Sequence, residues 1–330
     1  MTALAPAAPR LARRGSSRWL GSIGYFVVLA EIILFSVASP HFLSADNLAT
    51  ILGQAAVYAI AAFGLTLVVA VGGDDVIRGG IDLSIGATLG LAGAVVALLS
   101  GAGAPFPVAV LAGLAVGAAI GLLNGLVVVA GVRPLLVTLA TMSMVASLTI
   151  VLTNNVKIPA TGPEFALLRD GGPAGLSGAV LVLIVVFAIV AFLLGRTRWG
   201  TRAYAVGQNP VAARVAGISV ARYTVTSYVC ASILAALAGV LMTARLSAAL
   251  PGIGEQMLID ILLASLMSIA FSRRLVVTIT GTLFSAVFVA VLTNGFTQLG
   301  VGSQWIGIAK GALILIVLAV AAIRERSVRR

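Results

Sequence analysis

The charged side chains of this 330-residue chain are few, and four of them gather between two long apolar runs, in the stretch GGDDVIRGGIDLSIG from Gly72 to Gly86. Each charge would cost roughly 2.5–3.5 kcal/mol on a helix that faces lipid near the bilayer centre. We therefore expect these charges to face water, protein or one another. The glycine pairs interrupt a helix, and Asp82 precedes the next apolar run, so that its carboxylate can cap the N–H groups exposed there.

We interpret this stretch as a broken-helix connector. Irregular backbone is tolerated in a membrane where it lines an aqueous cavity or is buried in protein. Two interpretations stay open at this point: a simple cytoplasmic loop between two helices, and a re-entrant segment that lines a gate. The connector residues assigned to the gate are Gly72, Gly73, Asp74, Asp75, Arg78, Gly79 and Gly80.

Other polar side chains lie within apolar runs, where they are functional candidates by default. The candidates for a solute pathway are Gln54, Asp82, Ser84, Asn124, Thr138, Asn294 and Gln304, together with Lys310. Hydrogen bonding between helices is the alternative role for each of them, and serine and threonine can also bond their own helix backbone. Glu31, in the middle of the first run, is expensive there unless it is paired or reaches water.

Enzyme chemistry finds little support in the sequence. His41 is the only histidine and Cys230 the only cysteine, so an internal disulfide, a Cys-rich metal site and a His-based catalytic arrangement all lack their residues. The chain also lacks the G-x-x-x-x-G-K-[ST] loop that cradles the phosphates of ATP. We expect no catalytic residue, metal or bound cofactor on this chain. If ATP drives the protein, a partner subunit uses it.

Membrane helices are the elements that must position these groups. Hydrophobic residues make up 60% of the chain and charged residues 9%, against roughly 25% charged residues in a soluble domain. Windows of about 20 apolar residues predict an all-α, polytopic membrane bundle of about ten helices, with the first run retained rather than cleaved as a signal peptide. The predicted spans are Trp19–Ala38, Leu48–Val71, Leu83–Ser100, Pro107–Val129, Leu135–Thr153, Ser177–Gly195, Tyr223–Ala244, Met257–Phe271, Leu275–Phe296 and Gln304–Ile323.

The basic residues predict the orientation of the bundle. If the N-terminus is cytoplasmic, 17 of the 21 basic residues fall on the cytoplasmic side, so the positive-inside rule predicts that both termini lie in the cytoplasm. Residues 1–18 and 324–330 then form basic tails around a single transmembrane domain, 19–323. The formal charge of +11 does not indicate nucleic-acid binding, because the basic residues occupy short connectors without forming a continuous patch.

Two short stretches suggest an internal repeat. LLNGLVVVAGV, Leu122 to Val132, resembles VLTNGFTQLGV, Val291 to Val301, and in the predicted topology they run in opposite directions. A repeat of five plus five spans in inverted orientation has this property and is a common plan among transporters. Separately, glycine recurs at every fourth position from Gly113 to Gly125, which predicts close packing of one helix face.

Four motifs in order carry a resemblance to a known family: GGIDLSIGATLGLAGAVVALL, GLLNGL, VTLATMS and YAVGQNPVAARVAGI. From Phe42 to Ile323 the chain resembles the permease subunits of bacterial ATP-driven importers for monosaccharides of the ribose, xylose and galactose type. The resemblance implies an inner-membrane complex with a cytoplasmic ATPase dimer, a second permease chain, identical or related, and a periplasmic solute-binding protein. The amide and hydroxyl candidates above suit the hydroxyl groups of a sugar.

The longest basic connector predicts a short helix at about residues 208–218. Asn209 can cap it, Pro210 suits its first position and Gly217 a left-handed stop, and it is too short to span a bilayer. In the resembling family this position holds the coupling helix, which docks in a groove of the ATPase. The residues assigned to coupling are Asn209, Pro210, Ala212, Ala213, Arg214, Gly217 and Ile218, with Ala212, Ala213, Val215 and Ile218 as apolar contacts and Arg214 as a polar rim. A helix that lies on the bundle or on lipid is the alternative.

Two stretches depart from the family pattern. The connector reads GGDD before GGID, and SLMSIAFSRRLVV, Ser265 to Val277, stands where the family has a glycine-rich loop. They leave the gate geometry and the identity of the sugar open, and a nucleoside, a signalling furanose and a branched-chain amino acid are alternative solutes. The rival function is a secondary transporter driven by an ion gradient, which also has inverted repeats and broken helices but does not require the short cytoplasmic helix.

Overall fold

The protein is described by a computed structural model in which residues 23–73, 80–171, 176–272 and 276–328 are placed, with side chains as far as residue 316. The helices and strands follow in this order: α2 Ile23–Ala38, α3 Ala45–Gly72, α4 Ser84–Gly101, α5 Phe106–Val129, α6 Pro134–Thr153, β1 Ile158–Pro159, α7 Pro163–Arg169, α8 Gly178–Arg196, α9 Arg198–Gln208, α10 Pro210–Val215, α11 Val220–Leu246, β2 Ala248–Ala249, α12 Ile253–Leu266, the 3₁₀ helix η2 Met267–Phe271, α13 Ile279–Gln298 and α14 Ser303–Val328.

The described residues form the predicted polytopic helical bundle. Eight helices among them are long and apolar enough to cross a membrane, and the two shorter apolar helices, Gly24–Ala38 and Ser303–Ile316, occupy the first and tenth predicted spans. The prediction of about ten helices in an all-α bundle is therefore confirmed. The start of the first span and the tail 1–18 lie outside the described residues. β1 and β2 pair antiparallel as a two-stranded clip between two connectors.

Local signals set most helix boundaries. Ser44 accepts a hydrogen bond from the Asn47 N–H at the start of α3, and Thr278 caps α13 through the Gly281 N–H. Because of the Thr278 cap, α13 begins four residues after the predicted start at Leu275. At the other end, α11 stops at Ser247, which adopts a left-handed conformation with φ of 55°.

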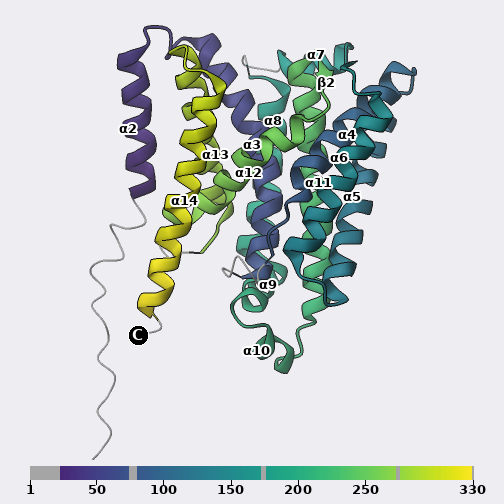
Figure 1. The fold of residues 1–330 in the computed structure, drawn as a ribbon, viewed down its shortest axis with the longest axis vertical. Coiled ribbons are helices and arrows are strands. Elements are labelled where there is room, and N and C mark those ends of the chain that lie inside the picture. The colour runs from purple at the N-terminus through teal and green to yellow at the C-terminus, as the bar shows by residue number, and fades with distance from the viewer. Residues whose placement is uncertain (1–22, 74–79, 172–175, 273–275, 329–330) are drawn as a thin grey trace, which may run out of the picture.

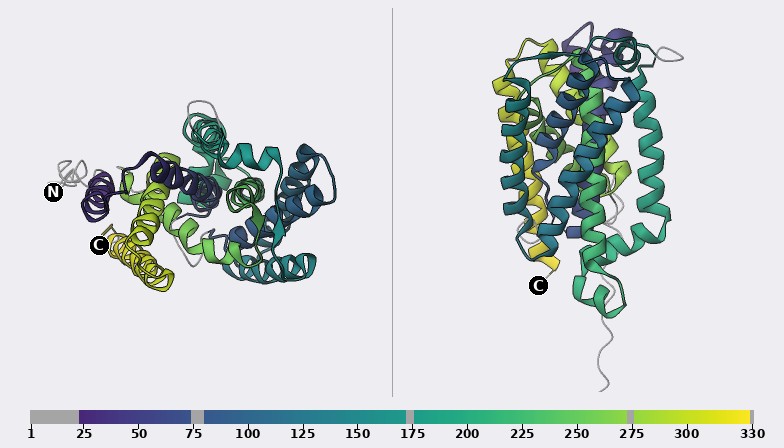
Figure 2. Two further views of the ribbon diagram at one scale, coloured as in Figure 1. Left: turned by 90° about the horizontal axis from the view of Figure 1, so that it is seen from above. Right: turned by 90° about the vertical axis from the view of Figure 1, so that its right-hand side faces the viewer.

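The helices run between two ends of the bundle (Figure 1). The end that carries α10 is called the inner end here, and the opposite end, with α7 and β2, is the outer end. α14 ends toward the inner end, and the first residue of α2 lies at the end of that helix nearer to the inner end. α3 lies at the centre, packed against α8, α11, α12 and α13, as the two further views also show (Figure 2).

The central helices pack as an inverted repeat requires. α5 runs toward the inner end and α13 away from it (Figure 1), so the two similar stretches have the predicted opposite directions. In an inverted repeat, α3, α4 and α5 of the first half correspond to α11, α12 and α13 of the second. α3 packs against α12 and α13, and its counterpart α11 packs against α4 and α5, so the contacts correspond as well. The outer helices depart from this pattern, because α8 lies against α3 whereas α2 lies against α13.

The glycine stripe of α5 confirms the predicted close packing. A β-carbon at Gly117 would lie 2.6 Å from the Ser232 carbonyl oxygen, and one at Gly121 would lie 2.5 Å from that of Tyr228. Both carbonyls belong to α11, so the absence of side chains lets the backbones of α5 and α11 approach closely. Gly113 faces α4 instead, next to Val96.

Candidate functional site

The connector between α3 and α4 is described at its two ends. Gly73 ends α3 with φ of 84°, a conformation that suits glycine, and a β-carbon there would lie 2.5 Å from the Gly207 carbonyl oxygen of α9. Gly80 and Ile81 are buried, so the connector enters α4 from inside the bundle. The remaining predicted gate residues, Asp74, Asp75, Arg78 and Gly79, lie outside the described residues, and their role stays a prediction.

Four predicted pathway residues meet where the connector joins α4. Asp82 Oδ1 accepts from the Ser84 N–H at 2.9 Å and from the Ser84 hydroxyl at 2.6 Å. Asn124 of α5 donates through Nδ2 to Ser84 Oγ at 2.8 Å, and Asn124 Oδ1 accepts from Thr141 of α6 at 2.7 Å. Thr138 donates to the Ile81 carbonyl at 3.3 Å. The group Asp82, Ser84, Asn124 and Thr141, called the connector network, is almost fully buried and ties α4, α5 and α6 together.

The expected capping by Asp82 is confirmed in this network, since its carboxylate binds the first N–H of α4. Thr141 was not among the sequence candidates. Its position in VTLATMS was the available signal, but the hydroxyl could equally have bonded to its own helix, as those of Thr149 and Thr153 do.

Asn294 belongs to a separate cluster near the outer end. Its Nδ2 donates to Asn47 Oδ1 at 2.8 Å, and Asn47 Nδ2 donates back to Asn294 Oδ1 at 3.0 Å. Gln298 Nε2 also donates to Asn47 Oδ1, at 2.9 Å. These bonds fasten the start of α3 to the end of α13. The predicted candidate Gln304 is exposed in the first turn of α14 and joins neither cluster.

A string of five polar side chains, called the outer lane, occupies the outer half of the bundle. Lys310 Nζ of α14 forms an ion pair with Asp260 Oδ1 of α12 at 2.6 Å. The Tyr58 hydroxyl of α3 faces Asp260 and accepts from Gln54 Nε2 at 2.7 Å. Gln54 Oε1 accepts from Arg245 of α11 at 3.4 Å. Only Gln54 and Lys310 were predicted, because Tyr58 and Asp260 stand singly in apolar runs and Arg245 falls in a connector by sequence.

Glu31 remains without a hydrogen-bond partner among the described residues, although its carboxylate is buried. It lies on the face of α2 that packs against α13, in line with Val28 and Phe35. The sequence predicted a need for a partner or for water at this position. The contacts of the described residues show neither a charged partner nor a hydrogen-bond donor for Glu31.

The predicted short helix exists as α10, Pro210–Val215. Asn209 Oδ1 accepts from the N–H groups of Val211 and Ala212, at 3.1 and 2.9 Å, and Gly217 adopts the left-handed conformation with φ of 76°. α10 lies at the inner end beside α9 and the start of α11 (Figure 1).

One predicted contact residue of α10 is corrected by the structure. Ala213 is only 4% exposed and packs against the chain itself, and Ile218 is half-buried in the same way. The apolar side chains that α10 presents to the outside are Val211, 67% exposed, Val215, 87% exposed, and the predicted contact residue Ala212, which is also exposed. Six residues are too few for sequence periodicity to indicate which side of a helix faces its own protein.

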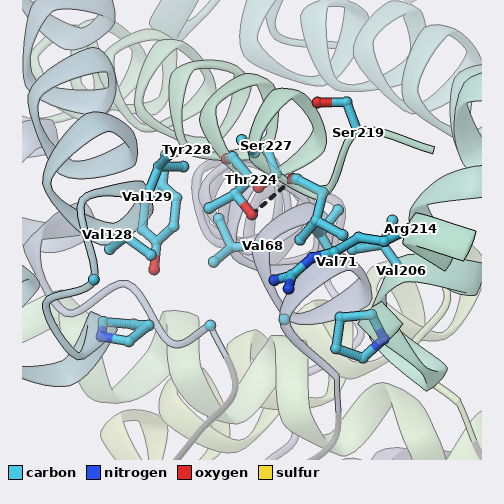
Figure 3. Close-up of a pocket in the computed structure, with 17 residues that line it drawn as sticks. Val68, Val71, Val128, Val129, Val206, Arg214, Ser219, Thr224, Ser227 and Tyr228 are labelled. Carbon is cyan, nitrogen blue, oxygen red and sulfur yellow. Dashed lines mark hydrogen bonds between the residues drawn. The ribbon is translucent and has the colours of Figure 1, made fainter. Parts of the chain in front are cut away.

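A cavity of about 660 Å³ opens beside α10. The ends of α3 and α5, α10 and the first turns of α11 surround it, with Val68, Val128 and Thr224 among the lining residues (Figure 3). The Arg214 guanidinium reaches into the cavity from one side. Tyr228 lines it on the other side, and its buried hydroxyl has no hydrogen-bond partner among the described residues. Arg214 is thus exposed on α10 and also lines this cavity.

Comparisons with known proteins all find transport permeases similar to this chain. The family described as "Branched-chain amino acid transport system / permease component" matches residues 47–318. The ribose import permease protein RbsC of Escherichia coli is 36% identical over 89% of this chain and 91% of its own length, and that of Bacillus subtilis is 35% identical over 89% of each. The galactose/methyl galactoside import permease protein MglC of Haemophilus influenzae is 29% identical over 90% of this chain and 92% of its own.

Proposed function

The chain belongs to the permease components of ATP-binding-cassette importers, and on this premise we propose that it carries a simple sugar across the bacterial inner membrane. The likeness to ribose and galactose permeases over about nine tenths of the chain carries the proposal. It favours a sugar over a branched-chain amino acid, although the family description names the latter. The buried amide and hydroxyl groups support the same choice, because they suit an uncharged polyhydroxyl solute.

We propose that the chain works with the partners that the family resemblance implies. These are a cytoplasmic ATPase dimer, a second permease chain, identical or related, and a periplasmic solute-binding protein. ATP is used by the ATPase, and this chain binds no cofactor. The excess of arginine in the connectors on the α10 side supports an orientation with the inner end, both termini and α10 in the cytoplasm.

The contacts of α10 support a role in coupling. Val211 and Val215 offer an apolar surface to a partner, while Ala213 anchors the helix to the bundle. The neighbouring α9 touches the connector, because Gly207 lies against Gly73. A displacement of α10 and α9 by the ATPase would therefore reach the connector and the cavity beside it, which is how the closure of one protein can move helices in another.

Transport by the assembled complex tests the proposed function. The chain is reconstituted in liposomes with its ATPase and binding-protein partners, and uptake of labelled ribose, xylose, galactose, leucine and a nucleoside is compared with and without ATP. ATP-dependent uptake of a sugar is expected. Uptake by this chain alone, driven by a proton gradient, would favour the secondary transporter instead.

Substitutions in α10 test the coupling role. Val215→Glu places a charge on the exposed surface of α10 and should lower sugar uptake at least about tenfold, with normal membrane insertion and ATP hydrolysis no longer stimulated by the loaded binding protein. We expect the same loss of sugar uptake in Arg214→Glu. The exposed Val156→Glu, at the outer end, is the matched control, and equal uptake in Val215→Glu and Val156→Glu would contradict the assignment.

A further inference from the structure

The outer lane descends from the outer end to the middle of the bundle. Arg245 is the last residue but one of α11, and Gln54 and Tyr58 lie about 14 and 20 Å along α3 from its first residue, at 1.5 Å per residue. Asp260 stands midway along α12, and Lys310 lies in the outer third of α14. The lane therefore places hydrogen-bonding groups at successive depths of the membrane.

The outer lane holds more hydrogen-bond donors than its own bonds use. A guanidinium has five N–H donors and an ammonium three. Among the described residues, Arg245 makes one hydrogen bond, to Gln54, and Lys310 makes one ion pair, to Asp260. Lys310 is buried and Arg245 is half-buried. Because buried donors normally have partners, the spare donors of the lane can bond to a further hydroxyl-bearing molecule or to water.

The same two helices line the outer lane and the inner cavity. α3 contributes Gln54 and Tyr58 to the lane and Val68 to the cavity, and α11 contributes Arg245 to the lane and Tyr228 to the cavity. Gln54, Tyr58, Arg245 and Tyr228 thus lie along one pair of adjacent helices, α3 and α11, which pack against each other. Asp260 and Lys310 join the lane from α12 and α14.

We propose that the outer lane is the outer half of the solute pathway, and that its side chains exchange their bonds with one another for bonds with the hydroxyl groups of the solute. This inference rests on the proposed function. Without solute, the Asp260–Lys310 pair and the Tyr58–Gln54 bond close the lane. With solute, the carboxylate accepts from neighbouring hydroxyls, Arg245 and Lys310 donate to hydroxyl and ring oxygens, and the phenol and amide do both.

Thiol labelling on α3 is the deciding test. In the full importer with Cys230→Ala, which leaves no native thiol, Gln54→Cys is compared with Leu52→Cys. Leu52 lies two residues away at nearly the same depth, but it is 38% exposed on the outside of the bundle. There lipid keeps a thiol protonated and unreactive. A charged, membrane-impermeant thiol reagent is added to resting, nucleotide-bound and transporting complexes.

We expect Gln54→Cys to react at least about tenfold faster than Leu52→Cys during transport, and sugar-loaded binding protein to slow that reaction. Equal rates at the two positions in all three states would overturn the proposal. The Cys230→Ala parent separates this result from the proposed function: if it transports a solute other than a sugar, the proposed function fails, and the labelling is repeated with that solute.

A second measurement uses the amount of solute moved per ATP hydrolysed. Tyr58→Phe removes one hydroxyl from the outer lane and should lower this ratio roughly two- to tenfold, the range of one hydrogen bond. Tyr25→Phe, on α2, is the matched control, because the Tyr25 ring packs against Phe271 and Phe284 away from the lane. A purely structural loss would reduce uptake and ATP hydrolysis together, and an unchanged ratio in Tyr58→Phe would count against the lane.

Discussion

Two buried carboxylates, Asp82 just before α4 and Asp260 within the corresponding helix α12, have different partners, and Asp82 Oδ2 has none among the described residues. Asp82, at the start of α4, accepts from the neutral donors of Ser84, whereas Asp260, within α12, is paired with the ammonium of Lys310. The connector network stays within the first half, in α4, α5 and α6. The outer lane joins α3 of the first half to α11, α12 and α14 of the second.

The difference indicates which contacts persist and which must separate. Transporters built from inverted repeats work by moving one repeat or bundle against another. Side chains that bond within one half move together with that half, so the connector network can remain intact through a cycle. On the proposed pathway, side chains that bond across the halves separate when the halves move, which lets the spare donors of Arg245 and Lys310 bond to solute or water.

Loss of the buried ammonium should have the largest effect on stability. Lys310→Met leaves the Asp260 carboxylate unpaired in a buried place, a cost of about 3–5 kcal/mol, and should lower the unfolding temperature of the purified permease. The control is Lys157→Met, which changes the other, exposed lysine. Adding Asp260→Asn should restore most of the stability, and equal instability of the single and double variants would show that the charge is not the cause.

Loss of the amide at the centre of the connector network should have a smaller effect. Asn124→Leu leaves Ser84 Oγ without its donor and Thr141 without its acceptor, which costs about 1–3 kcal/mol for buried polar groups. The free energy of unfolding in denaturant measures it. A loss as large as that of Lys310→Met would contradict the distinction between the neutral and the charged group.

The sequence predicted what depends on neighbours along the chain. The spans followed from hydropathy, and α10 followed from Asn209, Pro210 and Gly217, since capping and turn formation act over a few residues. The close approach of α5 to α11 was likewise predicted by the glycine spacing, but not the identity of the partner helix.

Contacts between distant segments could not be predicted from the sequence. Asp260 and Lys310 are separated by 50 positions, and a single carboxylate in an apolar run does not indicate which helix will supply its cation. The seven pathway candidates were treated as one set. The structure divides them among the connector network, the Ile81 carbonyl beside it, to which Thr138 bonds, the Asn47–Asn294 cluster, the outer lane and an exposed position. The prediction that Ala213 contacts a partner was wrong, because the burial of a side chain on α10 depends on how α10 packs against α9 and α11.

The smallest expected effect sharpens the comparison inside the connector network. Thr141→Val removes one neutral hydrogen bond, to Asn124 Oδ1, and should cost about 0.5–1.5 kcal/mol. Thr149→Val is the matched control on the same helix, because the buried Thr149 hydroxyl bonds only to the Val145 carbonyl of its own helix. In a double-mutant cycle measured by denaturant unfolding, Thr141→Val should be non-additive with Asn124→Leu, whereas Thr149→Val should be additive. Additivity for both threonines would mean that the network does not act as a unit, and that the first half owes its rigidity to helix packing instead.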